Sequence, residues 1–137
     1  MNFSKIKQAG ARINGGAWVK DIPVDGFADV ALKVRGANNP DARRLRDSLV
    51  REASDGRKGG LSPDQADAIN GRIIAETILV GWNLTDDAGA PVPATQENVA
   101  EFLADPDIGP LLREAVSWAS AMVGSRGVDE IEAAAKN

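Results

Sequence analysis

The residue types that most often perform chemistry in proteins are rare or missing in this sequence of 137 residues. Histidine, cysteine and tyrosine are absent, so the commonest general base, the thiolate nucleophile and the usual zinc ligands are lacking. Any catalysis would rest on carboxylates, Lys, Arg, Ser or Thr. No arrangement of these residues matches a catalytic pattern, and we expect a protein that is not an enzyme and needs no cofactor.

Two segments resemble ligand-binding loops without meeting their requirements. A calcium loop needs oxygen ligands at alternate positions and a Glu at the twelfth, whereas Asp86 and Asp87 are adjacent and the chain soon reaches Pro91. A phosphate loop needs a preceding strand and a Lys-Ser or Lys-Thr pair before its helix. Residues 56–60 (GRKGG) instead follow a helical pattern. We therefore predict a plain turn, a linker and no metal site.

Charge is divided unevenly along the chain. Residues 1–60 carry 12 Lys and Arg against 7 Asp and Glu, a net charge of +5, whereas residues 61–137 carry 4 against 13, a net of −9. Such a division favours attraction between two halves or two subunits, or contact with nucleic acid. The cations near Arg43, Arg44 and Arg51 alternate with Asp41 and lack interleaved aromatics, so a solvated helix is favoured over a nucleic-acid surface.

The start of the chain lacks the apolar block of a secretory signal. No segment approaches the roughly 18 apolar residues that a membrane span requires. We therefore expect a soluble cytoplasmic protein that does not bind membranes.

Apolar spacing predicts an α+β fold that is mainly α, with an N-terminal β-hairpin followed by four to five helices in one small domain. Val30, Leu32 and Val34 alternate as in a half-buried strand. Asp25-Gly26 provides the chemistry of a tight turn back to a strand near Trp18. The predicted segments are a flexible arm (1–16), a globular domain (17–124) with a hairpin (17–36) and helices (about 40–53, 63–81, 96–104 and 107–123), and an acidic C-terminal helix or tail (125–137).

Capping residues define where these helices begin. Asn39 precedes Pro40, and Ser62 precedes Pro63 with Gln65 three positions after Ser62, which completes a capping box. The apolar residues after Pro63 form a wide stripe, so we expect the 63–81 helix to lie at the centre of the core and to end at Gly81. A lone hairpin is marginal in water, so residues 17–36 must pack on helices or pair with another chain.

The order of several short segments resembles the tail assembly chaperones of long-tailed bacteriophages and prophages. The shared themes are a strand with Trp, an apolar run ending in Gly-Trp, an acidic turn, a proline-flanked helix start and a Leu-x-Asp-Pro step. In this sequence they are residues 17–23 (AWVKDIP), 34–36 (VRG), 39–45 (NPDARRL), 78–82 (ILVGW), 86–89 (DDAG), 91–93 (PVP), 95–99 (TQENV) and 102–106 (FLADP). The resemblance covers roughly residues 17–124.

This resemblance implies a non-catalytic protein that binds the tape-measure protein, the tail-tube protein or both during tail assembly, and that is absent from the mature virion. A helix-in-groove contact would serve such a client, and many copies on one client would add avidity. The alternatives are a structural head–tail or tail connector subunit, and a small nucleic-acid-binding regulator that uses the basic N-terminal half.

Large apolar side chains at the ends of elements are the predicted contact residues. They are frequent anchors at protein interfaces. Trp82, Leu84, Phe102, Leu103 and Trp118 are predicted to contact the client, and the hairpin around Trp18 to mediate self-association or contact with tube subunits.

Overall fold

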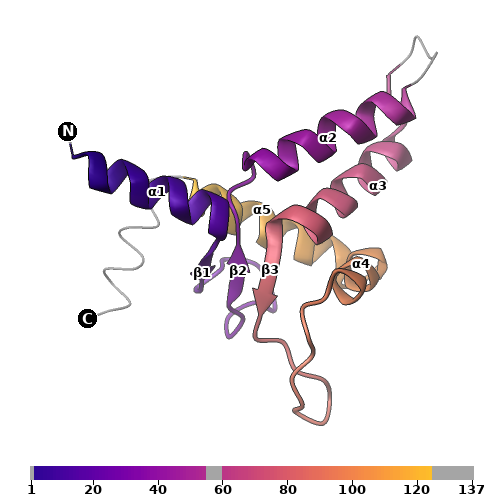
Figure 1. Ribbon diagram of the computed structural model, residues 1–137. Helices are drawn as coiled ribbons and strands as arrows, with labels where there is room; N and C mark the ends of the chain where they lie inside the picture. Colours follow the sequence, from indigo (N-terminus) through magenta and orange to yellow (C-terminus); the bar gives the residue numbers. More distant parts are fainter. Residues whose placement is uncertain (1, 55–59, 125–137) are drawn as a thin grey trace.

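The computed structural model describes residues 2–54 and 60–124 and shows an α+β fold that is mainly helical, as predicted (Figure 1). The expected linker at residues 56–60 lies mostly outside the described residues, and the acidic segment 125–137 lies wholly outside them. In chain order the elements are α1 (Phe3–Gly15), β1 (Ala17–Val19), β2 (Leu32–Val34), α2 (Pro40–Ala53), α3 (Pro63–Ile73), the π-helix η1 (Ile74–Ile78), β3 (Leu79–Trp82), α4 (Gln96–Ala104) and α5 (Gly109–Val123).

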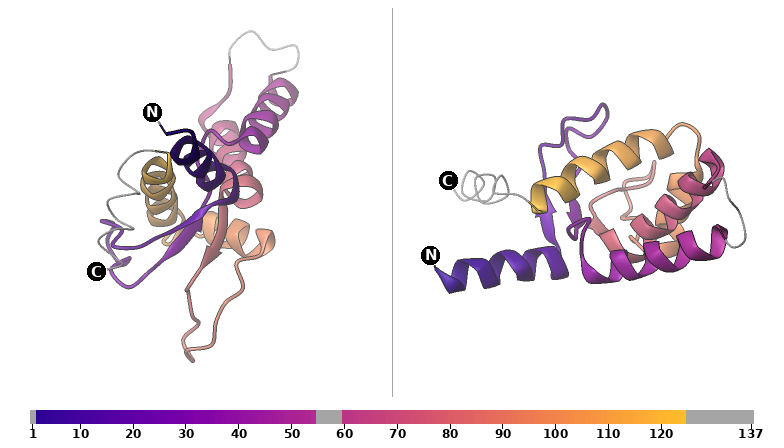
Figure 2. Two further views of the ribbon diagram at one scale, coloured as in Figure 1. Left: turned by 60° about the vertical axis from the view of Figure 1, so that its left-hand side comes forward. Right: turned by 90° about the horizontal axis from the view of Figure 1, so that it is seen from above.

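The strands form one antiparallel sheet in the order β1-β2-β3, and α5 packs against one face of it (Figures 1 and 2). The expected hairpin pairing is confirmed, with Ala17 opposite Val34 and Val19 opposite Leu32. Asp25 and Gly26 form the expected tight turn, closed by the Phe27 N–H donating to the Val24 carbonyl at 3.0 Å. It does not join the strands directly, because the strands are shorter than expected and residues 20–31 connect them. Buried side chains in that connection, including Ile22 and Phe27, hold it against the core.

A third strand replaces the end of the predicted 63–81 helix. The helix α3 stops at Ile73, continues for one π-helical segment and becomes β3, which pairs with β2. Gly81 therefore lies within a strand and does not cap a helix. The physical reason is a long-range contact: the hairpin leaves an edge of β2 unpaired, and β3 satisfies its hydrogen-bonding groups.

The predicted flexible arm is also a correction, because residues Phe3–Gly15 form the helix α1. The side chain of Asn2 caps it by accepting a hydrogen bond from the Ser4 N–H at 2.9 Å. Phe3, Ile6 and Ile13 then recur at helical spacing. No residue of α1 is buried, and the helix projects from the rest of the fold (Figure 1).

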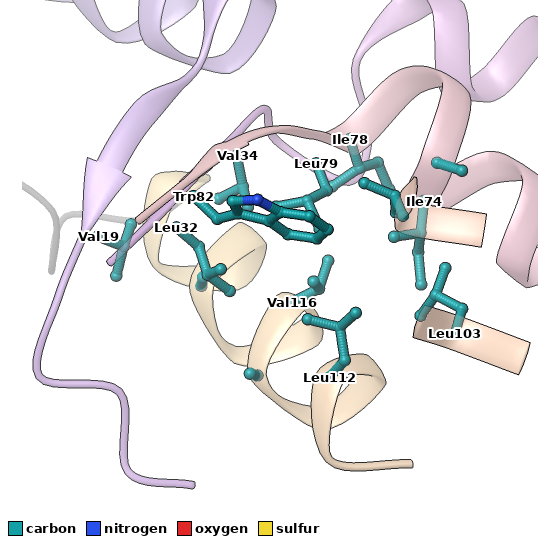
Figure 3. Close-up of a cluster of buried hydrophobic side chains, with 14 of the residues drawn as sticks. Val19, Leu32, Val34, Ile74, Ile78, Leu79, Trp82, Leu103, Leu112 and Val116 are labelled. Atoms are coloured by element: carbon teal, nitrogen blue, oxygen red, sulfur yellow. The ribbon is translucent and has the colours of Figure 1, made fainter. Parts of the chain in front are cut away.

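The core lies between the sheet and α5, and Trp82 is inserted into it (Figure 3). Its indole stacks on Phe102 of α4 with ring centroids 5.3 Å apart, and its Nε1–H donates to the Val92 carbonyl at 2.7 Å. Leu112 and Val116 of α5 face the same cluster (Figure 3). The single indole thus joins β3, the loop after it and α4.

Buried Asn39 joins the start of α2 to η1. Its Oδ1 accepts from the Ala42 N–H, as an N-cap does, and its Nδ2 donates to the carbonyls of Gly36 and Thr77, all at 2.9 Å. The cap predicted at this position is confirmed, as is the capping box of Ser62 and Gln65. Predicted bounds of 40–53 and 96–104 match α2 and α4, and α5 begins two residues after the expected 107.

Candidate protein-binding site

A groove of about 440 Å³ lies where α3 and η1 face α4. We call it the α3–α4 groove. Its lining residues come from three elements, with Arg113 of α5 at the edge. They are Asp67, Ala68, Gly71, Arg72, Ala75, Glu76, Gln96, Glu97, Ala100, Leu103, Ala104 and Arg113.

Small residues form the floor of this groove. Ala68, Gly71 and Ala75 follow each other at spacings of three and four, so they share one face of the helix that runs through α3 into η1. On α4, Ala100 and Ala104 have the same spacing, and the side chains of both are exposed. Because the side chains that both helices place here are short, the groove has room for a ridge of larger apolar side chains from another polypeptide.

Charged side chains of both signs form the rim. Arg72 and Glu76 make an ion pair of 2.8 Å, and this hydrogen bond raises the pKa of the Arg72 guanidinium. Arg113 donates to the Asp67 carbonyl at 3.3 Å, and a Cβ placed on Gly71 would lie 3.4 Å from its guanidinium. Glu97, which is exposed, places an acidic side chain on the α4 side of the groove.

The six predicted contact residues are divided between the core and the surface. Trp82 and Leu103 are buried, so they stabilise the fold and position the groove wall. Phe102, Leu84 and Trp118 are half-buried and pack against the core. Leu103 also lines the α3–α4 groove.

Trp18 lies apart from the other five, on the sheet face that α5 does not cover. Its side chain is 53% exposed, whereas Ala17 and Val19 on either side are buried. A Cβ on Gly81 would lie 3.3 Å from the indole, so the ring crosses the sheet toward β3. Val80, the extra residue of the bulge in β3, is 44% exposed on this strand. An exposed apolar area of this kind is a candidate for protein contact.

The sequence does not single out the alanines of the groove, because small residues in a helical segment carry no sign of a binding role. The signal that was available is the matching three-and-four spacing on two helices with polar flanks. What the sequence could not show is that these two faces meet.

The acidic turn at Asp86 and the basic face of α2 have local explanations. Asp86 Oδ1 accepts from the N–H groups of Ala88 and Ala90, both at 2.9 Å, which confirms a turn. Asp41 binds Arg35 and Arg44 at 2.7 and 2.8 Å, and the Arg35 hydrogen bond is the main reason why the pKa of this carboxyl is lowered. Within residues 2–54 and 60–124, no cluster of three or more His, Cys, Asp or Glu could hold a metal ion.

Comparison with known proteins gives one result. A family model described as "YdaY prophage protein" matches residues 37–137, well over half of the chain. Neither a curated protein nor a solved structure matches. In the part of the chain that the structure describes, no helix has the length and apolar character to cross a bilayer.

Proposed function

Since the chain belongs to the YdaY prophage protein family, we propose that it acts in phage assembly as a non-catalytic tail assembly chaperone. Its client would be the long helical tape-measure protein, bound in the cytoplasm of the host bacterium before tail-tube subunits enclose it. The order of the segments between residues 17 and 106 resembles this class of protein, and that resemblance points to the client.

The α3–α4 groove is the observation that supports this proposal. It has an apolar floor of small residues and a rim with both signs of charge, which suits one face of an amphipathic helix. Shallow contact by each copy is sufficient for a client of great length, because many copies along one chain multiply the effective affinity.

The Trp82–Phe102 stack has a supporting role in this proposal. Phe102 belongs to α4, and its stack on Trp82 of β3 holds that helix against the core. Ala100 and Ala104 on the same helix are thereby kept at the groove. We therefore assign direct client contact to the groove and to Trp18, and a positioning role to Trp82 and Phe102.

The test is co-expression with the tape-measure protein encoded in the same prophage. Ala100→Trp places a large ring in the groove, and Ser48→Trp places the same ring on an exposed position of α2 as a matched control. The client is expected to be soluble when it is co-expressed with wild type or with Ser48→Trp. With Ala100→Trp, its soluble fraction is expected to fall to the level seen without any chaperone.

Two outcomes would refute the proposal. The first is a client whose solubility does not depend on the chain at all. The second is recovery of the chain from purified phage particles in stoichiometric amount, because a chaperone leaves before the particle is complete and a connector subunit stays.

A further inference from the structure

The helix α1 presents an apolar stripe that the described residues leave uncovered. Phe3 is 79% exposed and Ile6 is 54% exposed. Both recur on the side of the helix that also carries Gly10 and Ile13. Lys5 and Lys7 lie on opposite sides of this stripe, and residues 2–16 contain no acidic residue. The result is a cationic amphipathic helix on which Phe3 and Ile6 are not covered by any described residue.

The C-terminal end of α1 is attached to the domain by two hydrogen bonds. The Gly36 N–H donates to the Ile13 carbonyl at 3.0 Å, and Arg35 Nε donates to the Asn14 carbonyl. A Cβ on Gly36 would lie 2.8 Å from Ile13, so glycine permits this close contact. The attachment fixes the direction of α1, which points away from the sheet (Figure 2).

The α3–α4 groove lies on the other side of the molecule and has complementary features. In the views of Figures 1 and 2, α1 extends from one side while α3 and α4 lie on the opposite side. The groove floor is apolar, and Glu97 and Glu101 follow each other by one turn on α4, both exposed. The rim carries both signs of charge, and its α4 side, with Glu97, is acidic. That side, next to the apolar floor, suits the lysines and the apolar stripe of α1.

We propose that α1 of one copy docks in the α3–α4 groove of a second copy, so that the chain assembles head to tail. This inference rests on the same groove as the proposed function. Because α1 points away from the groove of its own chain, the contact is between molecules. A contact between two different surfaces is heterologous, so it continues from copy to copy and forms a ring or an open filament.

Symmetric pairing of α1 with α1 is disfavoured by charge. Such a pair would place Lys5 and Lys7 of both copies together with no acidic residue between positions 2 and 16 to offset them. The groove instead offers Glu97 among its lining residues, with the exposed Glu101 one turn further along α4. Charge complementarity therefore selects the groove as the site for the second copy's α1.

Head-to-tail assembly predicts competition with the client. A tape-measure helix and the neighbouring α1 would occupy the same groove, so client binding would release α1 from it. The assembled chain then keeps its own apolar residues covered until a client arrives.

The test uses two variants that each disable one half of the contact. Phe3→Asp/Ile6→Asp removes the stripe and leaves the groove intact, whereas Ala100→Trp fills the groove and leaves α1 intact. By sedimentation velocity at low salt, wild type and Ser48→Trp are expected to form assemblies that grow with concentration. Each disabled variant alone is expected to be a monomer, and their mixture is expected to form 1:1 dimers and nothing larger.

Several results would overturn the inference. They are a monomeric wild type at every concentration, assembly of the Phe3→Asp/Ile6→Asp variant like wild type, and a mixture without dimers. Assembly of Ala100→Trp alone would show α1–α1 pairing instead. A wild type that stays monomeric but binds vesicles of anionic phospholipid would assign α1 to membranes. Unfolding midpoints equal to wild type check that both variants fold.

Failure of this inference is distinguishable from failure of the proposed function. If the wild type is monomeric but Ala100→Trp no longer keeps the client soluble, the head-to-tail inference fails and the chaperone proposal stands. If the protein assembles but the solubility of the client does not depend on it, the chaperone proposal fails and the head-to-tail contact stands.

Discussion

The two faces of the three-stranded sheet carry one tryptophan each, and their surroundings are opposite. Trp82 is 8% exposed, stacked on Phe102 and hydrogen-bonded through its indole nitrogen. Trp18 is half-exposed and lies across Gly81 on the uncovered face. Fully burying a large apolar side chain contributes about 1.5–3 kcal/mol. Trp82 provides that contribution to folding. Trp18, Phe3 and Ile6 keep half or more of their surface exposed, so a partner that buries them would be stabilised by the remaining part.

The largest expected effect comes from truncating the two tryptophans separately. Trp82→Ala removes the stack, the hydrogen bond and a core volume, and should lower the free energy of unfolding by about 4 kcal/mol. Trp18→Ala should lower it by less than about 1 kcal/mol, because about half of this side chain is already in water. Urea unfolding of both variants measures the difference. Equal losses would mean that the two faces are not distinct.

Asn39 gives the next largest effect and tests the closed side of the comparison. Asn39→Ala removes the α2 cap and the side-chain donor of the buried Thr77 carbonyl, whereas the Gly36 carbonyl still accepts from the backbone N–H of residue 39, so we expect a loss of about 3 kcal/mol. Asn39→Asp keeps the cap acceptor but removes the two donors. In thermal unfolding, the midpoints of both variants should lie well below that of wild type.

Local signals predicted the helix starts, and long-range pairing determined what they missed. Asn39, Ser62 and Thr95 each cap a helix through a side chain within three residues, so the sequence contains the whole cause. The run at residues 78–80 is apolar and suits a helix or a strand equally. It becomes β3 because β2, far away in sequence, offers an unpaired edge.

The binding surfaces were less predictable for a related reason. Large side chains such as Trp82 and Phe102 were chosen as contacts, but their size is also what places them in the core. The groove depends on how α4 lies against α3, and α4 is held in place by its contacts with α5 and η1. The sequence predicts a flexible arm at residues 1–16, in which Phe3 and Ile6 share no face; they share one because α1 is helical.

A smaller effect is expected at low pH from Asp41 on the exposed side of α2. The pKa of this carboxyl is lowered in the fold from its ordinary value of 3.8, mainly by its hydrogen bond with Arg35. A lowered pKa contributes stability that is present above the unfolded value and is lost as pH falls through the folded one. The stability difference between wild type and Asp41→Asn should therefore shrink below about pH 4.

Acid titration of the unfolding midpoint measures this difference, with Asp47→Asn on the same helix as the matched control. A constant gap between wild type and Asp41→Asn down to pH 2 would contradict the assigned role of the Arg35–Asp41 pair.

The smallest effect on stability is expected where the surface is most open. Lys5→Glu/Lys7→Glu changes two exposed side chains of α1, so the free energy of unfolding should stay within about 0.5 kcal/mol of wild type. Assembly should be lost, and it should return when this variant is mixed with Glu97→Lys/Glu101→Lys. Restoration by the paired reversal, measured by sedimentation, would tie the loss to charge complementarity. Reversed pairs that stay apart would argue against it.

The central claim is that the α3–α4 groove receives a helix of another polypeptide, and photo-crosslinking from the groove tests it most directly. Benzoylphenylalanine is introduced at Gln96, an exposed residue that lines the groove, or, as control, at Ser48 of the full chain in cells that produce tails, and the crosslinked partners are identified by mass spectrometry. The account predicts crosslinks from position 96 to helical segments of the tape-measure protein and to α1 of this chain, and none from position 48. Equal labelling from both positions, or labelling from position 48 alone, would contradict it.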